Sequence, residues 1–317
     1  MAKPAFEALG RRWQRFSQPG QAQLQVHLPG QASRLVPLHP GIYRIGRDKD
    51  CQICVDHPAV SRQHALLERR RQWRVQQGAL LLEQPEGRIR AQGDQAVLEI
   101  TEPSPSRLLV AEAMILAGAA VAAYGWEQGL ALPYRSQLPA VLPPDSELIA
   151  LPAGPVRHAA IKRCLSRGHT GAEPSGHFSL GLSAYVQATS PIRRYADLVV
   201  QRQLLALQQN AEPLAAEALQ GLLTDLDGSI RQGIQISRED QRHWQQVWFH
   251  NHRQEHWAAL FLRWLRPQDR LGLVHVDALG LDLAAECPAG SQPGDALQLR
   301  VQLVDPLRDQ LRLLATG

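Results

Sequence analysis

Residues 177–198 read HFSLGLSAYVQATSPIRRYADL, and this stretch is the most informative part of the chain. Its first half predicts a strand and a turn. Its second half predicts the beginning of a helix over about residues 192–208. Thr189 or Ser190 can cap this helix, and Pro191 suits its first turn. The segment therefore predicts mixed α/β structure in the middle of the chain.

Two adjacent arginines, Arg193 and Arg194, would lie in the first turn of that helix. A helix N-terminus already favours anions, so like charges would gather where the helix dipole is positive. Such a break with the usual preference for Asp and Glu is expected where a phosphate is held, because the arginine fork can bind two phosphate oxygens. The alternative is that both arginines are solvated or pair with Asp197.

The motif TSPIRRYAD at residues 189–197, preceded by HFSLGL and a tyrosine, resembles the signature of the RNase II (RNB) family of exoribonucleases. Residues 102–117 resemble the family helix that supplies an acidic residue, here Glu112, to the active-site cavity. Residues 132–135 resemble the strand that follows this helix. Residues 301–306 resemble the end of the C-terminal OB-fold of the family.

The resemblance covers roughly residues 76–317 and implies an α+β fold. It places the C-terminal part of an RNB domain at residues 77–256 and an OB-like β-barrel at residues 257–317. Five short apolar runs between residues 258 and 314 agree with a small barrel.

In that family, RNA enters a deep cavity with its 3′ end first. Two divalent ions, Mg²⁺, are held by aspartates and activate water, so that one nucleotide is released at a time. The resemblance implies two catalytic residues, with Arg193 on the scissile phosphate and Glu112 near the last nucleotide. The implied contacts to single-stranded RNA are Arg193, Arg194, Tyr195, Tyr134 and Arg135. The alternatives are core packing for Tyr195 and, because Glu112 is alone on an apolar helix, a buried partner for Glu112.

The family's aspartate cluster, D-x5-D-x-D-D, has no counterpart before Gly78, where the aspartates are Asp48, Asp50 and Asp56. The helix after the signature also carries Gln201-Arg202 where many members have His-Arg. The resemblance therefore predicts a chain that binds RNA and has little or no nuclease activity alone. No metal ligands are predicted.

A second resemblance lies in the N-terminal segment, where GR at residues 46–47 and SRQH at residues 61–64 resemble a forkhead-associated (FHA) domain. This resemblance implies a β-sandwich that binds phosphothreonine peptides through Arg47 and Ser61, helped by Arg62. Short apolar runs from about residue 23 to residue 75 predict strands. We expect a leader at residues 1–20 and a partial sandwich at residues 21–76.

The FHA asparagine-glycine element is missing, so about half of such a sandwich is expected before RNB-like sequence begins. A gene fusion with a deletion or an imperfect gene model would both explain this junction. Two alternative functions follow from it. One is a phosphothreonine-peptide adaptor, and the other is a truncated or fused product without stable function.

Composition narrows the function classes. Residues 1–74 carry 13 Lys and Arg against 5 Asp and Glu, a balance of +8, so the net charge of +4 leaves −4 for the remainder. The sequence pI of about 9.1 is therefore no argument for an RNA channel further along the chain.

The four cysteines are too sparse for a disulfide framework and fit a cytoplasmic protein. Cys51 and Cys54 have no second pair at zinc spacing. The apolar residues 108–124 predict a buried helix and no membrane span.

Overall fold

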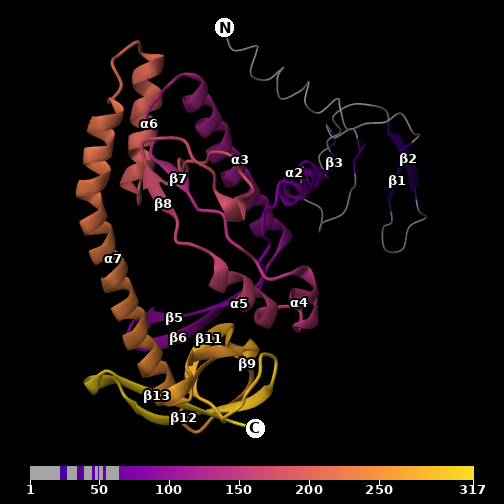
Figure 1. Ribbon diagram of the computed structural model, residues 1–317, viewed down its shortest axis with the longest axis vertical. Helices are drawn as coiled ribbons and strands as arrows, with labels where there is room; N and C mark the ends of the chain where they lie inside the picture. The colour runs from indigo at the N-terminus through magenta and orange to yellow at the C-terminus, as the bar shows by residue number, and fades with distance from the viewer. Residues whose placement is uncertain (1–21, 27–33, 39–44, 47–48, 50–52, 55–63) are drawn as a thin grey trace. The chain divides into compact units, whose positions relative to one another are not determined.

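The computed structural model of the chain describes residues 22–26, 34–38, 45–46, 49, 53–54 and 64–317 (Figure 1). The chain divides into two compact units, Met1–Gln72 and Trp73–Gly317. In the first unit, β1 (Ala22–Val26) and β2 (Arg34–Leu38) form an antiparallel hairpin. There, β3 (Ile45–Gly46) also pairs in parallel with β4 (Ile53–Cys54). The strands predicted around Leu24 and Leu35 are confirmed, and the predicted leader lies outside the described residues.

Helix α2 (His64–Gln76) occupies a segment that the sequence predicted as strands. The prediction of strands at residues 65–67 and 73–75 is wrong. The segment is rich in Arg, Leu and Gln, which all favour helix, whereas Trp73 and Val75 are its few residues that favour strands. The strand run that suggested an FHA-like sandwich therefore ends before residue 64.

The second unit mixes helices and strands, in agreement with the predicted α+β class. Its elements after α2 are β5 (Glu86–Gln92), β6 (Gln95–Thr101), α3 (Pro105–Glu127), β7 (Tyr134–Ser136), α4 (Asp145–Ala150), α5 (Pro155–Cys164), β8 (His169–Gly171), η2 (Phe178–Leu180), α6 (Tyr195–Gln208), α7 (Ala216–Asn251), β9 (His256–Arg266), η3 (Pro267–Asp269), β10 (Leu271–Val276), η4 (Asp277–Leu279), β11 (Leu281–Glu286), β12 (Ala296–Asp305), η5 (Pro306–Arg308) and β13 (Gln310–Thr316).

One apolar core joins α3, β7, the segment before α6, and α6 itself. Its buried members are Ala122, Leu130, Leu132, Tyr134, Ala184, Val186 and Val200. β7 pairs antiparallel with β8, and Tyr134 also bridges to Val186 on the other side. Glycines on α3 permit close packing, because a Cβ on Gly118 would lie 2.3 Å from the Val186 carbonyl oxygen. This core fixes the segment that carries the informative motif.

Helix α3 buries one face only. The helix begins after Ser104, which caps it: the Arg107 backbone N–H donates to the Ser104 hydroxyl at 3.3 Å. The most apolar 18-residue stretch of α3 has a mean hydropathy of 1.8, and 22% of this stretch is buried inside the protein. By length and composition alone, α3 is the one helix among the described residues that could cross a membrane. Val110, Tyr124 and Trp126 are exposed, so the predicted burial holds for one face of the helix.

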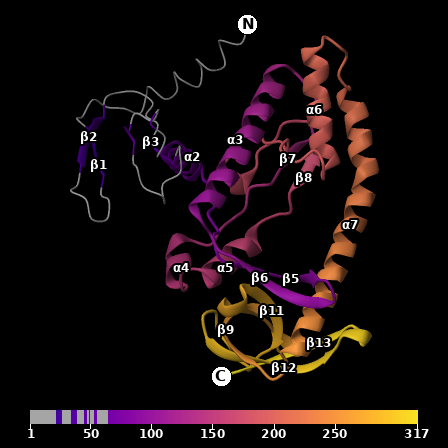
Figure 2. The same cartoon turned by 180° about the vertical axis from the view of Figure 1, so that it is seen from behind.

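Helix α7 runs unbroken for 36 residues and continues through Gly228. Leu219 anchors its first part in a small core with Val199, and Trp248 and Phe249 anchor its end in the core of the β-barrel. Figures 1 and 2 show it linking the helical region to the barrel. Because both ends are held by tertiary packing, the low helix propensity of its three exposed glycines, Gly221, Gly228 and Gly233, does not break it.

Helix glycines in open and in crowded surroundings are expected to respond in opposite ways to replacement by alanine, as measured by the free energy of unfolding. A Cβ on Gly228 would meet no atom within 4 Å, so Gly228→Ala is expected to raise the free energy of unfolding by about 0.5–1 kcal/mol. Gly118→Ala is expected to lower it by about 1–3 kcal/mol, because the new Cβ would meet the Val186 backbone and the Tyr185 ring. Urea unfolding of the two variants checks this, and equal signs would contradict the packing described above.

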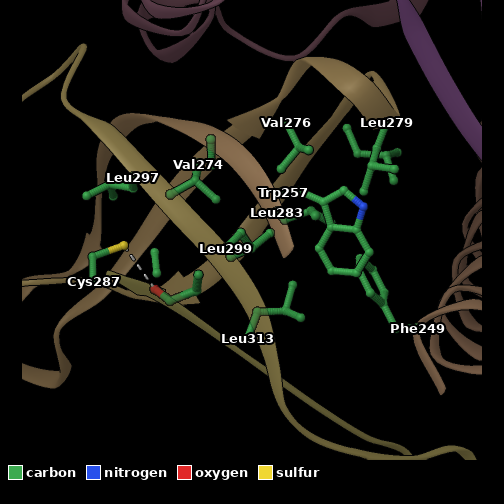
Figure 3. Close-up of a cluster of buried hydrophobic side chains, with 14 of the residues drawn as sticks. Phe249, Trp257, Val274, Val276, Leu279, Leu283, Cys287, Leu297, Leu299 and Leu313 are labelled. Carbon is green, nitrogen blue, oxygen red and sulfur yellow. Dashed lines mark hydrogen bonds between the residues drawn. The ribbon is translucent and has the colours of Figure 1, made fainter. Parts of the chain in front are cut away.

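Strands β9 to β13 close into a five-stranded barrel in the order β10-β11-β13-β12-β9. The predicted number of strands is confirmed, and their predicted bounds agree to within a few residues. Figure 3 shows the barrel core, where Phe249 of α7 packs edge-on against Trp257 with ring centroids 5.4 Å apart. In β11, buried and exposed residues alternate strictly along most of the strand, as expected for a strand with one face on the core.

The β5–β6 hairpin packs against this barrel. Ile89 of β5 is buried in the barrel core, and Ala96 and Leu98 of β6 pack against it. At the contact, the Gly87 backbone N–H donates to the Gly280 carbonyl oxygen at 2.8 Å. The hairpin therefore ties the beginning of the second unit to its C-terminal barrel.

Candidate nucleic-acid interface

The TSPIRR motif forms a closed turn just before α6, and the helix begins at Tyr195. The prediction that it begins at Ile192 is therefore wrong by three residues. The Ser190 carbonyl oxygen accepts from the backbone N–H groups of Arg193 and Arg194 at 3.2 and 3.0 Å. These bonds wind residues 190–194 into a turn of their own, and Arg194 takes the N-cap position with extended backbone angles.

Asp197, in the first turn of α6, closes this arrangement. Its side chain is fully buried, and its Oδ2 accepts from the Ser190 backbone N–H at 2.8 Å and from Arg194 Nη2 at 2.7 Å. Oδ1 of Asp197 and Nε of Arg194 are buried without a hydrogen bond to any described residue. The carboxylate thus binds the beginning of the turn and its end at once.

The two neighbouring arginines have different surroundings. The Arg194 side chain is 27% exposed and pairs with Asp197. Arg193 is exposed, and its Nη2 donates weakly to the Ser190 hydroxyl at 3.4 Å. Arg193 forms no ion pair with a residue that the structure describes. Tyr195, the first residue of α6, is 45% exposed. The sequence-based alternative of pairing with Asp197 is met by Arg194 and not by Arg193.

A row of partly buried polar side chains continues from this turn. Burial raises the pKa of Tyr185, with the Arg194 charge lowering it and the Asp197 charge raising it. The Tyr185 ring meets His177 edge-on, with ring centroids 5.9 Å apart. Burial also lowers the pKa of His177, and the positive charge of Arg135 acts in the same direction. Arg135 donates from its backbone to the Tyr185 carbonyl oxygen at 2.7 Å.

Arg135 and Tyr134, two of the RNA contacts that the resemblance implies, are both at least partly buried. Arg135 is half-buried, and its guanidinium donates to the Thr170 hydroxyl on β8 at 3.2 Å. Tyr134 is 1% exposed within the core that α3 and α6 share, and burial raises the pKa of its hydroxyl. These positions place Arg135 close to the polar row and Tyr134 beneath it. Their predicted contacts to RNA stay predictions.

Glu112 is paired inside the protein. Both carboxylate oxygens accept from the guanidinium of Arg74 in the last turns of α2, through Nη2 and, at 3.0 Å, through Nε. Both residues are buried, with side chains 4% and 2% exposed. Arg74 Nη1 donates in addition to the Leu180 carbonyl oxygen at 3.1 Å. Glu112 therefore has the buried partner that the sequence analysis gives as one alternative. The other alternative, a catalytic role, stays a prediction.

Arg47, Ser61 and Arg62, the predicted phosphothreonine ligands, lie outside the described residues. Cys51 and the aspartates at positions 48, 50 and 56 lie outside them too. Within residues 64–317 and the other described segments, no three His, Cys, Asp or Glu side chains gather as metal ligands would. The phosphopeptide prediction stays open.

Sequence reasoning missed the roles of Arg74, His177 and Tyr185. Arg74 was assigned to a strand, and its partner Glu112 is 38 residues away, so no local pattern links them. His177 and Tyr185 lie within the motif, but their contact depends on the fold of the segment between them. From the sequence, Asp197 was named only as a possible ion-pair partner of the two arginines, in the alternative to phosphate binding.

The RNB domain model matches residues 46–210, which is more than half of the chain. The chain belongs to the RNB family. The match begins inside the segment that the FHA resemblance occupies, and no comparison shows an FHA domain. The RNB match also extends beyond the predicted boundary at residue 77.

Two curated proteins that are similar to this chain are named as ribonucleases. An uncharacterized ribonuclease of Synechocystis is 41% identical over 247 residues, covering 77% of this RNB chain and 37% of the relative. The chloroplastic and mitochondrial ribonuclease II of Arabidopsis thaliana is 32% identical over 262 residues, covering 77% of the chain and 31% of the relative. The chain therefore spans about a third of the length of these relatives.

Solved structures agree on the fold. The Dss1 exoribonuclease of Candida glabrata, as an active-site mutant, matches with a TM-score of 0.68 and 18% identity, over 80% of this chain and 35% of that chain. RNase R of Mycoplasma genitalium, in complex with ribose-methylated single-stranded RNA, matches with a TM-score of 0.59 and 16% identity, over 80% and 48%. The fold of this chain is therefore similar, over about four fifths of its length, to the folds of these two exoribonucleases.

Proposed function

We propose that this chain binds single-stranded RNA as part of an RNase II-type ribonuclease, and that Arg193 contacts an RNA phosphate. The observation that carries the proposal is the closed turn at residues 190–194. It presents the Arg193 guanidinium to solvent while the Arg194 guanidinium is held by Asp197. An exposed arginine fork with no ion pair among the described residues, two residues before the exposed Tyr195, is suited to a phosphate and the base attached to it. Membership of the RNB family supports RNA as the ligand.

Hydrolysis is a separate question, because family members use Mg²⁺ held by aspartates. The described residues do not fit such a centre, since they gather no group of three acidic, His or Cys side chains. We derive no metal-dependent step from them. The proposal is therefore RNA binding without release of nucleotides by this chain alone. Mg²⁺-dependent release of nucleoside monophosphates by the pure protein would contradict it, and would point to Asp48, Asp50 or a second chain as the source of metal ligands.

Replacing Arg193 by Ala tests the binding site. We expect the affinity for a labelled single-stranded oligoadenylate to fall about tenfold, the size of one lost charge-assisted contact. The slope of log affinity against log salt should become shallower by about 0.7, because one fewer phosphate is neutralised. Fluorescence anisotropy at several salt concentrations measures both quantities.

Arg107→Ala is the matched control, because it removes one exposed arginine from the first turn of α3. It should change neither affinity nor slope appreciably. Equal losses in the two variants would mean that only the overall charge matters. A phosphothreonine-peptide library run beside the RNA tests the adaptor alternative, and peptide binding without RNA binding would favour that alternative.

A further inference from the structure

The adjacent arginines of the TSPIRR turn differ in what their side chains can still bind. Arg194 is held by a carboxylate that is 0% exposed, at 2.7 Å. A phosphate that took Arg194 away from Asp197 would leave this carboxylate buried without its cation. Breaking a buried pair in this way is strongly unfavourable. Arg193 has no such partner among the described residues, so it can bind a ligand at no such cost.

Asp197 also acts on the backbone. Its Oδ2 accepts the Ser190 backbone N–H at 2.8 Å, while the Ser190 carbonyl oxygen accepts the N–H groups of Arg193 and Arg194. One buried oxygen therefore fixes the residue from which the whole turn is wound. The direction in which Arg193 leaves the turn depends on these bonds.

We infer that Asp197 and Arg194 are positioning residues that hold the turn, and that of the two arginines only Arg193 contacts RNA. This inference rests on the proposed function, and it replaces the expectation that Arg194 is itself an RNA ligand. Tyr185 is part of the same support, because it lies near both charges and packs on Gly118 of α3. The turn is in this way tied to the core beneath it.

The sign of one mutational effect separates positioning from charge. Removing a carboxylate next to a site for a polyanion raises affinity if charge alone matters. If Asp197 positions the turn, Asp197→Ala weakens RNA binding although it removes a negative charge. Asp197→Asn is the matched variant, because its amide oxygen can still accept both bonds at the position of Oδ2. Its NH₂ then takes the place of Oδ1, which has no partner among the described residues.

The experiment measures oligoadenylate affinity, its salt slope, and the melting temperature for five variants: Arg193→Ala, Arg194→Ala, Asp197→Ala, Asp197→Asn and the double variant Arg194→Ala with Asp197→Ala. We expect Arg194→Ala and Asp197→Ala to lower the melting temperature by about 4–8 °C, because each leaves buried polar groups unpaired. Both should weaken binding several-fold, and the double variant should be no weaker than Asp197→Ala alone. Asp197→Asn should lie close to the wild type in both measurements.

Arg193→Ala should keep the melting temperature and lose about 0.7 of the salt slope, whereas Arg194→Ala should keep the slope. Tighter RNA binding by Asp197→Ala, or the same loss of slope in Arg194→Ala as in Arg193→Ala, overturns the inference. Failure of the proposed function has a different signature, because the wild-type protein would then bind no RNA. In that event the assignment of Arg193 to RNA fails with it. The melting temperatures still decide whether Asp197 and Arg194 hold the turn.

Discussion

Replacing Glu112 by Ala is expected to lower the free energy of unfolding by about 3–5 kcal/mol, because it leaves the Arg74 guanidinium buried without its counter-ion. The pair joins the end of α2 to α3, and Arg74 also reaches the Leu180 carbonyl oxygen in η2. Loss of the carboxylate would therefore loosen three segments at once. Equilibrium unfolding in urea, with constant slope against denaturant, gives the value.

The chain offers a matched control in Glu99→Ala. Glu99 pairs with Arg90 across the β5–β6 hairpin, but these side chains are 48% and 54% exposed. Removal of such a solvent-exposed pair should change stability by about 0–1 kcal/mol. The double replacement Arg74→Met with Glu112→Leu should recover much of the loss, because apolar side chains of similar volume need no counter-ion. A cost for Glu112→Ala as small as that for Glu99→Ala would show that the pair is solvated.

This pair bears on the catalytic role that the family resemblance gives Glu112. A nucleotide that bound the Glu112 carboxylate would have to displace Arg74 from it, at a side chain that is 2% exposed. By the same argument that separates Arg194 from Arg193, the ligand-binding groups of this chain are expected among its exposed polar side chains. Arg193 and Tyr195 meet that condition.

The barrel was the most predictable part of the fold. Its strands are short apolar runs separated by turn residues, and the alternation of buried and exposed side chains in β11 is a local signal. The helices were predicted less well where their ends are held by contacts with residues that are distant in the sequence. Helix α7, for example, continues through Gly228 because the packing of Leu219 and Trp248 holds its two ends.

The site shows the same division at the level of single residues. The motif at residues 189–197 carries Arg193, Arg194 and Asp197, which the structure brings together in one turn. The role of each side chain was not predictable, because the turn depends on a bond from the Ser190 backbone N–H to a carboxylate seven residues later. In the same turn α6 begins at Tyr195, and Asp197 accepts from the Arg194 guanidinium, whereas Arg193 donates only to the Ser190 hydroxyl.

Replacing Gly87 by Ala is expected to detach the β5–β6 hairpin from the barrel. The Cβ of alanine would lie 1.8 Å from the Leu279 carbonyl oxygen and 2.9 Å from the Leu279 carbonyl carbon, both backbone atoms that cannot turn aside. The contact is close on both sides, because a Cβ on Gly280 would lie 2.6 Å from the Gly87 nitrogen. If the hairpin moves, Ile89 leaves the barrel core, and the free energy of unfolding should fall by about 2–5 kcal/mol.

Gly93→Ala, at the tip of the same hairpin, separates this clash from general hairpin strain. Gly93 has a φ of 61°, but a Cβ there would meet no atom within 4 Å. Its alanine variant should therefore lose only about 1–2 kcal/mol, the cost of a left-handed backbone for a residue with a Cβ. A larger loss at Gly87 than at Gly93, together with faster amide exchange in β5 than in the wild type, locates the damage at the barrel contact. Equal losses would mean that the hairpin and the barrel do not depend on each other, and that Ile89 is not part of a common core.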